Sequence, residues 1–143
     1  MYEGLKTGME KYFQKVVSEE DTALNVGSGA HKTLLSTPAL AAFMIESAIS
    51  MVDPLLPRGY VTVGKNINIT HDAPTAKGIT VTMKATLTSV VGNHLEFEIV
   101  GMDELGVIAT GYHERYIVNY DKFMNNVEER CRLLTDESLR IED

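Results

Sequence analysis

The sequence has 143 residues, enough for one domain with a real hydrophobic core. Hydrophobic residues make up 44% and charged residues 23%, as in ordinary soluble globular proteins. The formal net charge is −7, and Lys and Arg are not gathered in one segment. Nucleic-acid binders concentrate these cations against phosphates, so we expect no nucleic-acid partner.

The single cysteine, Cys131, excludes an internal disulfide and a multi-cysteine metal site. No apolar run approaches the roughly 20 residues that span a bilayer. The first residues lack the basic-then-apolar order of a signal peptide. We therefore expect a cytoplasmic protein without a membrane partner.

The first half of the chain predicts a short strand, a loop and a buried helix. Residues 9–17 hold a short apolar segment that favours a strand, and residues 18–33 are a Ser-, Gly- and Thr-rich loop. A helix is predicted over 37–52, with Ser36 or Thr37 as cap and Pro38 in its first turn. Apolar residues occur on every side of this helix, which is typical of a buried one. Glu46 is its only charged residue.

The second half predicts four long strands and a final helix. Residues 60–71 alternate, with Val61, Val63, Ile67, Ile69 and His71 on one face, and Lys65 interrupts that face, which indicates either a bulge or an exposed strand end. Further strands are predicted over 79–90, from residue 95 and over 107–118, with tight turns at residues 92–93 and 103–106. The segment after Asn119 indicates a helix with an apolar stripe at Phe123, Val127, Cys131 and Leu134, and an acidic end that frays.

These elements predict a single α+β domain over residues 1–143, one long buried helix wrapped by an antiparallel sheet, with a C-terminal helix. A single sheet covers a helix on one side only. We therefore expect a second subunit to complete the burial, in a homodimer or a dimer of dimers.

Glu46 and His71 are the first candidates for chemistry. A buried carboxylate is normally paired, protonated or functional, because burying it alone costs several kcal/mol. Glu46 is thus either a capping or ion-paired group, or a base or nucleophile with a raised pKa. His71 shares a strand face with Ile67 and Ile69 and is either a structural core histidine or an acid/base partner of Glu46.

Several other polar residues have a structural and a functional interpretation. A helix-capping role accounts for Ser36 and Thr37, and either hydroxyl can also orient water or substrate. Gly64 interrupts a strand, which marks a bulge or a close backbone approach, and its N–H can serve as an oxyanion donor. The mixed charge of 113–115 favours a solvated salt-bridge patch at the sheet margin. No spacing typical of a metal site is present, so no metal is expected.

Three segments resemble one family. They are Ser36-Thr-Pro-Ala-Leu-Ala-Ala-Phe-Met-Ile-Glu-Ser-Ala, Asn66-Ile-Asn-Ile-Thr-His-Asp-Ala-Pro-Thr-Ala-Lys-Gly-Ile-Thr-Val-Thr, and Gly111-Tyr-His-Glu-Arg-Tyr-Ile-Val with the following Asp121-Lys-Phe. Together they resemble the fluoroacetyl-CoA thioesterase-like branch of the hotdog-fold acyl-CoA thioesterase superfamily. The resemblance runs from about Ser36 to Val127.

The resemblance implies a homodimer that hydrolyses a short-chain acyl-CoA thioester without a further cofactor. The family's catalytic glutamate falls on Glu46, its histidine on His71, the glycine near the thioester carbonyl on Gly64, and a substrate-region arginine on Arg115. Alignment on Glu46 places Pro38 where the family has a threonine, one residue after Thr37. Ser36 is the substitute candidate for that hydroxyl.

The chemistry leaves two questions open. Glu46 can act as general base or as nucleophile, with His71 assisting. Two other functions also use one carboxylic group and one histidine in such a fold: an enoyl-CoA hydratase-type lyase, and a non-catalytic module that binds an acyl-CoA or another small ligand. The acyl group is not specified by any motif.

Overall fold

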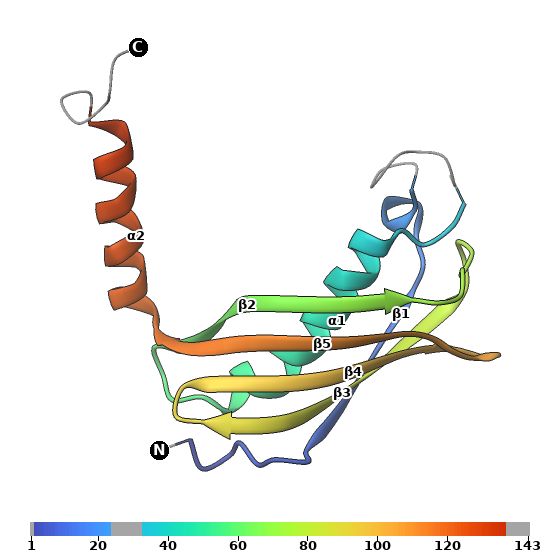
Figure 1. Cartoon of the computed structure of the whole chain (residues 1–143), viewed down its shortest axis with the longest axis horizontal. Coiled ribbons are helices and arrows are strands. Elements are labelled where there is room, and N and C mark those ends of the chain that lie inside the picture. Colours follow the sequence, from blue (N-terminus) through green and yellow to red (C-terminus); the bar gives the residue numbers. More distant parts are fainter. Residues whose placement is uncertain (1, 24–32, 137–143) are drawn as a thin grey trace.

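The computed structural model describes residues 2–23 and 33–136. Five strands form one antiparallel sheet in the order β1-β3-β4-β5-β2, and helix α1 lies across one of its faces (Figure 1). The strands are β1 (Glu10–Val16), β2 (Tyr60–His71), β3 (Thr80–Val91), β4 (His94–Asp103) and β5 (Gly106–Asn119). The helices are α1 (Thr37–Val52), α2 (Tyr120–Thr135) and the short 3-10 turns η1 (Glu19–Asp21) and η2 (Asp53–Leu55).

The α+β hotdog prediction is confirmed, and most predicted boundaries hold within one or two residues. The predicted bounds of the long helix and of the strand over 60–71 match α1 and β2. The weakly marked first strand is real and pairs with β3 at one edge of the sheet. Ile79 is 43% exposed and lies just outside β3, which begins at Thr80.

Helix α1 packs one stripe of side chains onto the sheet. The buried stripe follows the three- and four-residue spacing of a helix face and comprises Ala39, Leu40, Phe43, Met44, Ser47, Ala48, Met51 and Val52. Close approach to β5 depends on Gly111, where an added Cβ would lie 2.6 Å from Met44 Sδ. The hydrophobic core therefore lies between this stripe and the inner face of the sheet.

The opposite face of α1 is uncovered, so the prediction of burial on every side is wrong for the single chain. Ala42 and Glu46 are exposed, and Ile45 and Ile49 are only half-buried. The reason is geometric, since one sheet covers one side of one helix. The expectation that no apolar stretch reaches membrane length also needs correction. The 19 residues Thr37–Leu55 are long and apolar enough to span a membrane, by length and composition alone. Packing on the sheet explains their apolar character as that of a core helix.

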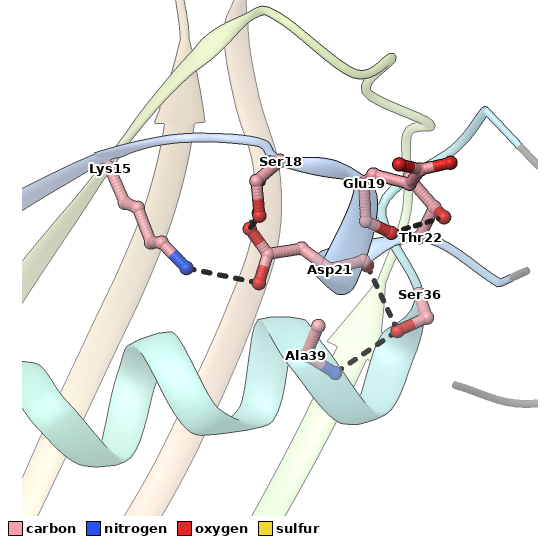
Figure 2. Close-up of polar contacts among 7 residues, drawn as sticks. All are labelled: Lys15, Ser18, Glu19, Asp21, Thr22, Ser36 and Ala39. Atoms are coloured by element: carbon pink, nitrogen blue, oxygen red, sulfur yellow. Dashed lines mark hydrogen bonds and ion pairs between the residues drawn. The ribbon is translucent and has the colours of Figure 1, made fainter. Parts of the chain in front are cut away.

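A polar cluster ties the start of α1 to the segment after β1 (Figure 2). The Ser36 hydroxyl accepts from the Ala39 N–H and donates to the Asp21 carbonyl, both at 3.2 Å. The Asp21 carboxylate accepts from Lys15 Nζ at 3.0 Å and from the Ser18 hydroxyl at 2.8 Å. Ser36 is thus the N-cap and is only 6% exposed, which fixes where the helix begins.

A β-bulge in β2 decides which residues face the helix. The register with β5 shifts between Gly64 and Asn66, so Lys65 is opposite no residue of β5, and of its two alternatives the bulge is confirmed. The bulge inverts the alternation. Gly64 is paired with the buried Arg115 and so shares the inner face with His71, whereas the prediction that Val61 and Val63 face inward is wrong. Thr62 is buried in their place.

The segment 113–115 lies in the interior of the sheet, and its predicted place at a solvated margin is wrong. Strand β5 runs between β4 and β2, so neither of its edges is free. His113 is 2% exposed and Arg115 is 5% exposed, while Glu114 between them points to the outer face. Charge in the sequence suggested solvent, but alternation along a central strand turns two of the three residues inward.

Helix α2 extends away from the sheet and contacts the end of β5 (Figure 1). Along its predicted apolar stripe, Phe123 and Val127 are half-buried, whereas Cys131 and Leu134 are exposed. The expected fraying of the acidic end concerns residues 137–143, which lie outside the described residues.

Candidate active site

Thr37 and His71 meet where α1 begins and β2 ends. The Thr37 hydroxyl lies 2.9 Å from His71 Nδ1, within hydrogen-bond distance. Thr37 is exposed and His71 is half-buried on the inner face of its strand, as its parity predicted. His71 Nε2 is buried and has no partner among the described residues, so the hydrogen bonding of this imidazole is incomplete within one chain. Ser36, the substitute candidate, has its hydroxyl committed to the helix cap.

Glu46 lies on the uncovered face of α1 and is exposed, so the predicted apolar enclosure of its carboxylate is wrong for the single chain. Nine residues separate it from Thr37, which places Glu46 about 13 Å further along the helix axis. A glutamate side chain is too short to span that separation. Within one chain, the predicted convergence of Glu46 and His71 does not occur.

Gly64 and Arg115 form a second constellation, beside the bulge. A Cβ added at Gly64 would lie 3.2 Å from Arg115 Nη1, so the guanidinium rests directly against the glycine backbone. The predicted close backbone approach at Gly64 is therefore confirmed. Because Gly64 is exposed, the buried cation lies just beneath the surface at this point.

Hydrogen bonds hold Arg115 in place. Its Nε donates to Thr62 Oγ1 at 2.7 Å and its Nη2 donates to the Thr62 carbonyl at 2.9 Å. The Thr62 hydroxyl in turn donates to the carboxylate of Asp53, at the C-terminal end of α1. Burial lowers the pKa of Arg115, while the charges of Asp53 and Glu46 raise it. At neutral pH the guanidinium remains charged.

His113 completes this network, and sequence reasoning missed it. Its Nδ1 lies 2.6 Å from the Asn66 carbonyl, and its Nε2 lies 3.2 Å from Arg115 Nη1. Burial lowers the pKa of His113, the Asn66 hydrogen bond raises it, the Arg115 charge lowers it and Glu114 raises it, with a lowered pKa as the net result. The alternation of β5 was the one sequence signal that could have placed His113 inside.

The two constellations are far apart within one chain. Gly64 lies in the first half of β2 and His71 is its last residue, so the two are about 20 Å apart at about 3.3 Å per residue with one residue absorbed by the bulge. The charge of Glu46 raises the pKa of Arg115, so we group Glu46 with Gly64 and Arg115. One chain thus holds two separate groups of candidate residues, which we call the half-sites: Thr37 with His71, and Glu46 with Gly64 and Arg115.

One further group could hold a metal ion. On the outer face of the sheet, ligand atoms of His94, Glu96 and Glu114 lie within 4.8 Å of one another. We call these three residues the outer-face cluster. Burial and hydrogen bonds to Glu114 and Glu96 raise the pKa of the adjacent Tyr112. The ligands come from two strands, which is why spacing along the sequence did not reveal them. The cluster lies on the face away from both half-sites.

Comparison with known proteins places the chain in a family. The sequence profile of the fluoroacetyl-CoA-specific thioesterases matches residues 17–121. A fluoroacetyl-CoA thioesterase of Streptantibioticus cattleyicolor is 31% identical over 97 residues, which cover 68% of this chain and 70% of that protein. The chain belongs to the fluoroacetyl-CoA-specific thioesterase family. It is accordingly an acyl-CoA thioesterase.

Solved structures agree with this family assignment. A hot-dog-like protein from Thermanaerovibrio acidaminovorans is 34% identical and superposes with a TM-score of 0.84, covering 90% of this chain and 94% of that one. The thioesterase FlK, as a threonine-to-serine variant in complex with acetyl-CoA, is 26% identical with a TM-score of 0.83, covering 88% and 98%. A FlK phenylalanine-to-alanine variant was solved with fluoroacetate and CoA, at 28% identity and a TM-score of 0.78 over 83% and 99%.

Proposed function

We propose that this thioesterase hydrolyses a short-chain acyl-CoA to the free acid and CoA, in active sites that two subunits build together. Binding of acetyl-CoA and of CoA by the FlK variants supports the substrate class. The observation that carries the proposal is the separation of the half-sites along α1 and β2. Each half holds part of what thioester hydrolysis needs, and neither holds all of it.

A two-fold symmetric dimer brings complementary halves together. Strand β2 is an edge strand, so a partner's β2 can lie antiparallel beside it. A two-fold axis near Ile67 and Asn68 places Gly64 of one subunit opposite His71 of the other. The same axis passing near Ala41 and Ala42 places Glu46 of one subunit beside Thr37 of the other.

The uncovered face of α1 suits this contact. Its centre consists of small and aliphatic side chains, because Ala41, Ala42, Ile45 and Ile49 are all at least partly exposed. Alanines allow two helices to approach closely, and the aliphatic pair supplies apolar area to bury. The same contact removes Glu46 from solvent and places its carboxylate against apolar side chains of the other subunit.

The chemistry then divides among named groups. The thioester carbonyl of the substrate lies against Gly64, whose backbone N–H and the Arg115 charge stabilise the developing oxyanion. The Glu46 carboxylate attacks the carbonyl or takes a proton from the attacking water. The Thr37–His71 pair of the other subunit orients the water and protonates the leaving thiolate. We propose that no metal or cofactor takes part and that the protein works in the cytoplasm, away from membranes.

Subunit complementation tests the shared site. A homodimer of Glu46→Gln or of His71→Ala has no active site with both wild-type groups. After mixing under conditions that exchange subunits, a heterodimer regains one site with both wild-type groups. An equal mixture contains about half heterodimers, so we expect about a quarter of the wild-type thiol-release rate. If both groups acted within one chain, mixing would restore nothing.

The substrate assay accompanies this test. Free-thiol release is measured over a panel from acetyl-CoA to longer and branched acyl-CoAs, with crotonyl-CoA followed for loss of its conjugated double bond. We expect the highest kcat/KM among the short chains. Hydration of crotonyl-CoA without thiol release, or tight binding of every ester with no thiol release, would contradict the proposed hydrolysis.

A further inference from the structure

The protonation state of His113 follows from its two neighbours. A carbonyl oxygen only accepts, so the 2.6 Å contact with the Asn66 carbonyl requires a proton on Nδ1. In the neutral ring Nε2 then carries a lone pair, which accepts from Arg115 Nη1 at 3.2 Å. A doubly protonated ring would turn an N–H toward the N–H of Arg115. The contacts therefore select one neutral tautomer.

The surroundings favour that neutral form. His113 is 2% exposed, and the ring of Phe97 on β4 lies 6.0 Å away between centroids. The charged groups acting on it are Arg115 on the same face and Glu114 on the outer face, while the bulge of β2 presents the Asn66 carbonyl. Glu46 and Asp53, from the α1 side, act on Arg115.

The position of His113 links two features of the Gly64 half-site. One ring nitrogen holds the bulge, two residues beyond Gly64, and the other holds Nη1, the guanidinium nitrogen that lies against Gly64. The other two nitrogens of Arg115 are fixed by Thr62. Without His113, Arg115 Nη1 loses the one hydrogen-bond partner that it has among the described residues. The bulge also loses the hydrogen bond between the His113 ring and the Asn66 carbonyl.

We propose that His113 is a positioning residue, a neutral imidazole that fixes Arg115 Nη1 and the bulge in one register so that the cation faces the thioester through Gly64. This inference rests on the proposed function, since it assigns Arg115 and Gly64 to the substrate carbonyl. His113 does not touch the substrate. It acts through Arg115.

Two matched variants separate the two ring contacts. In His113→Gln the amide oxygen reaches the place of Nε2 and can accept from Arg115. In His113→Asn the amide nitrogen takes the place of Nδ1 and can donate to Asn66, but nothing accepts from Arg115. We expect His113→Gln to keep kcat within about threefold and His113→Asn to lose about 10- to 100-fold, with KM changed less than threefold in both, because the lost bond involves a charged group.

The outcomes distinguish this inference from the proposed function. An active wild type whose two variants have equal kcat, whether normal or reduced, overturns the positioning role. A wild type that releases no thiol from any acyl-CoA overturns the proposed function and the role of His113 with it. If the variants fail to fold, nitrogen-15 NMR of the His113 imidazole in the wild type at pH 7 tests the proposed tautomer. We expect a protonated Nδ1 and a bare Nε2, and either the other tautomer or a charged ring contradicts the proposal.

Discussion

Replacing Gly64 with alanine probes the closest contact in the candidate site. The added Cβ would lie 3.2 Å from Arg115 Nη1 and 3.8 Å from His113 Cε1. Gly64 is not among the glycines with positive φ, so the backbone itself accepts alanine. In the folded chain, the strain of the substitution therefore comes from the contact with Arg115.

The magnitude follows from how firmly Arg115 is held. Three hydrogen bonds fix the guanidinium, so it cannot swing aside and must shift by a few tenths of an ångström. Overpacking of this kind costs about 1–3 kcal/mol, offset by about 0.4–1 kcal/mol gained from the less flexible unfolded chain. We expect a net loss of about 1 kcal/mol in unfolding free energy. Because complete loss of an oxyanion donor costs about 10²–10³ in rate, a partial displacement should lower kcat about 10- to 100-fold.

Two measurements check this expectation. Thiol release gives kcat and KM, and chemical denaturation gives the free energy of unfolding. Gly4→Ala is the matched control, because its Cβ would meet only Leu55 among its nearest atoms, at an ordinary 3.4 Å, and no residue of either half-site. If Gly64→Ala turned over acyl-CoA at the wild-type rate, the assignment of Gly64 and Arg115 to the thioester carbonyl would be wrong.

Four further predictions follow from the same contacts. Glu46→Gln should keep the fold and lose most thioesterase activity, since an amide is neither base nor nucleophile; near-normal turnover would remove Glu46 from the mechanism. Thr37→Val should lower kcat/KM about 10-fold by removing the bond to His71, whereas Ser36→Ala should cost about 0.5–2 kcal/mol of stability with kcat intact, and the reverse pattern would exchange the two hydroxyls. Burial raises the pKa of Asp21, but hydrogen bonds from Ser18 and Lys15 outweigh burial and the pKa is lowered, so the contribution of this carboxylate to stability is present above about pH 4 and lost below it. The free energy of unfolding should therefore fall less steeply with decreasing pH in Asp21→Asn than in the wild type. An equal pH dependence in the two proteins would contradict this. Prolonged dialysis against EDTA should leave thiol release unchanged, because the outer-face cluster lies away from both half-sites, and a loss restored by Zn²⁺ would contradict a metal-free reaction.

Much of the fold was determined by local pattern in the sequence. The two-residue alternation of β3 and β4 sets their inner faces through the pleat of a strand, and Ser36 with Pro38 sets the start of α1 through the free N–H groups of a first helical turn. The same local motifs carried the family resemblance. Thr37, Gly64 and His71 were named from their places in the sequence pattern, whereas Arg115 was named only through the family resemblance.

Tertiary structure alone decided which candidates meet. One extra residue at the bulge turned Gly64 toward Arg115, since strand parity inverts with a single insertion. Central placement of β5 buried His113, where charge in the sequence suggested solvent. The distance along α1 separated Glu46 from His71, because a helix advances a fixed length per residue whatever its side chains are. Sequence patterns report the faces of individual elements, whereas the distances between candidate residues depend on how whole elements are packed.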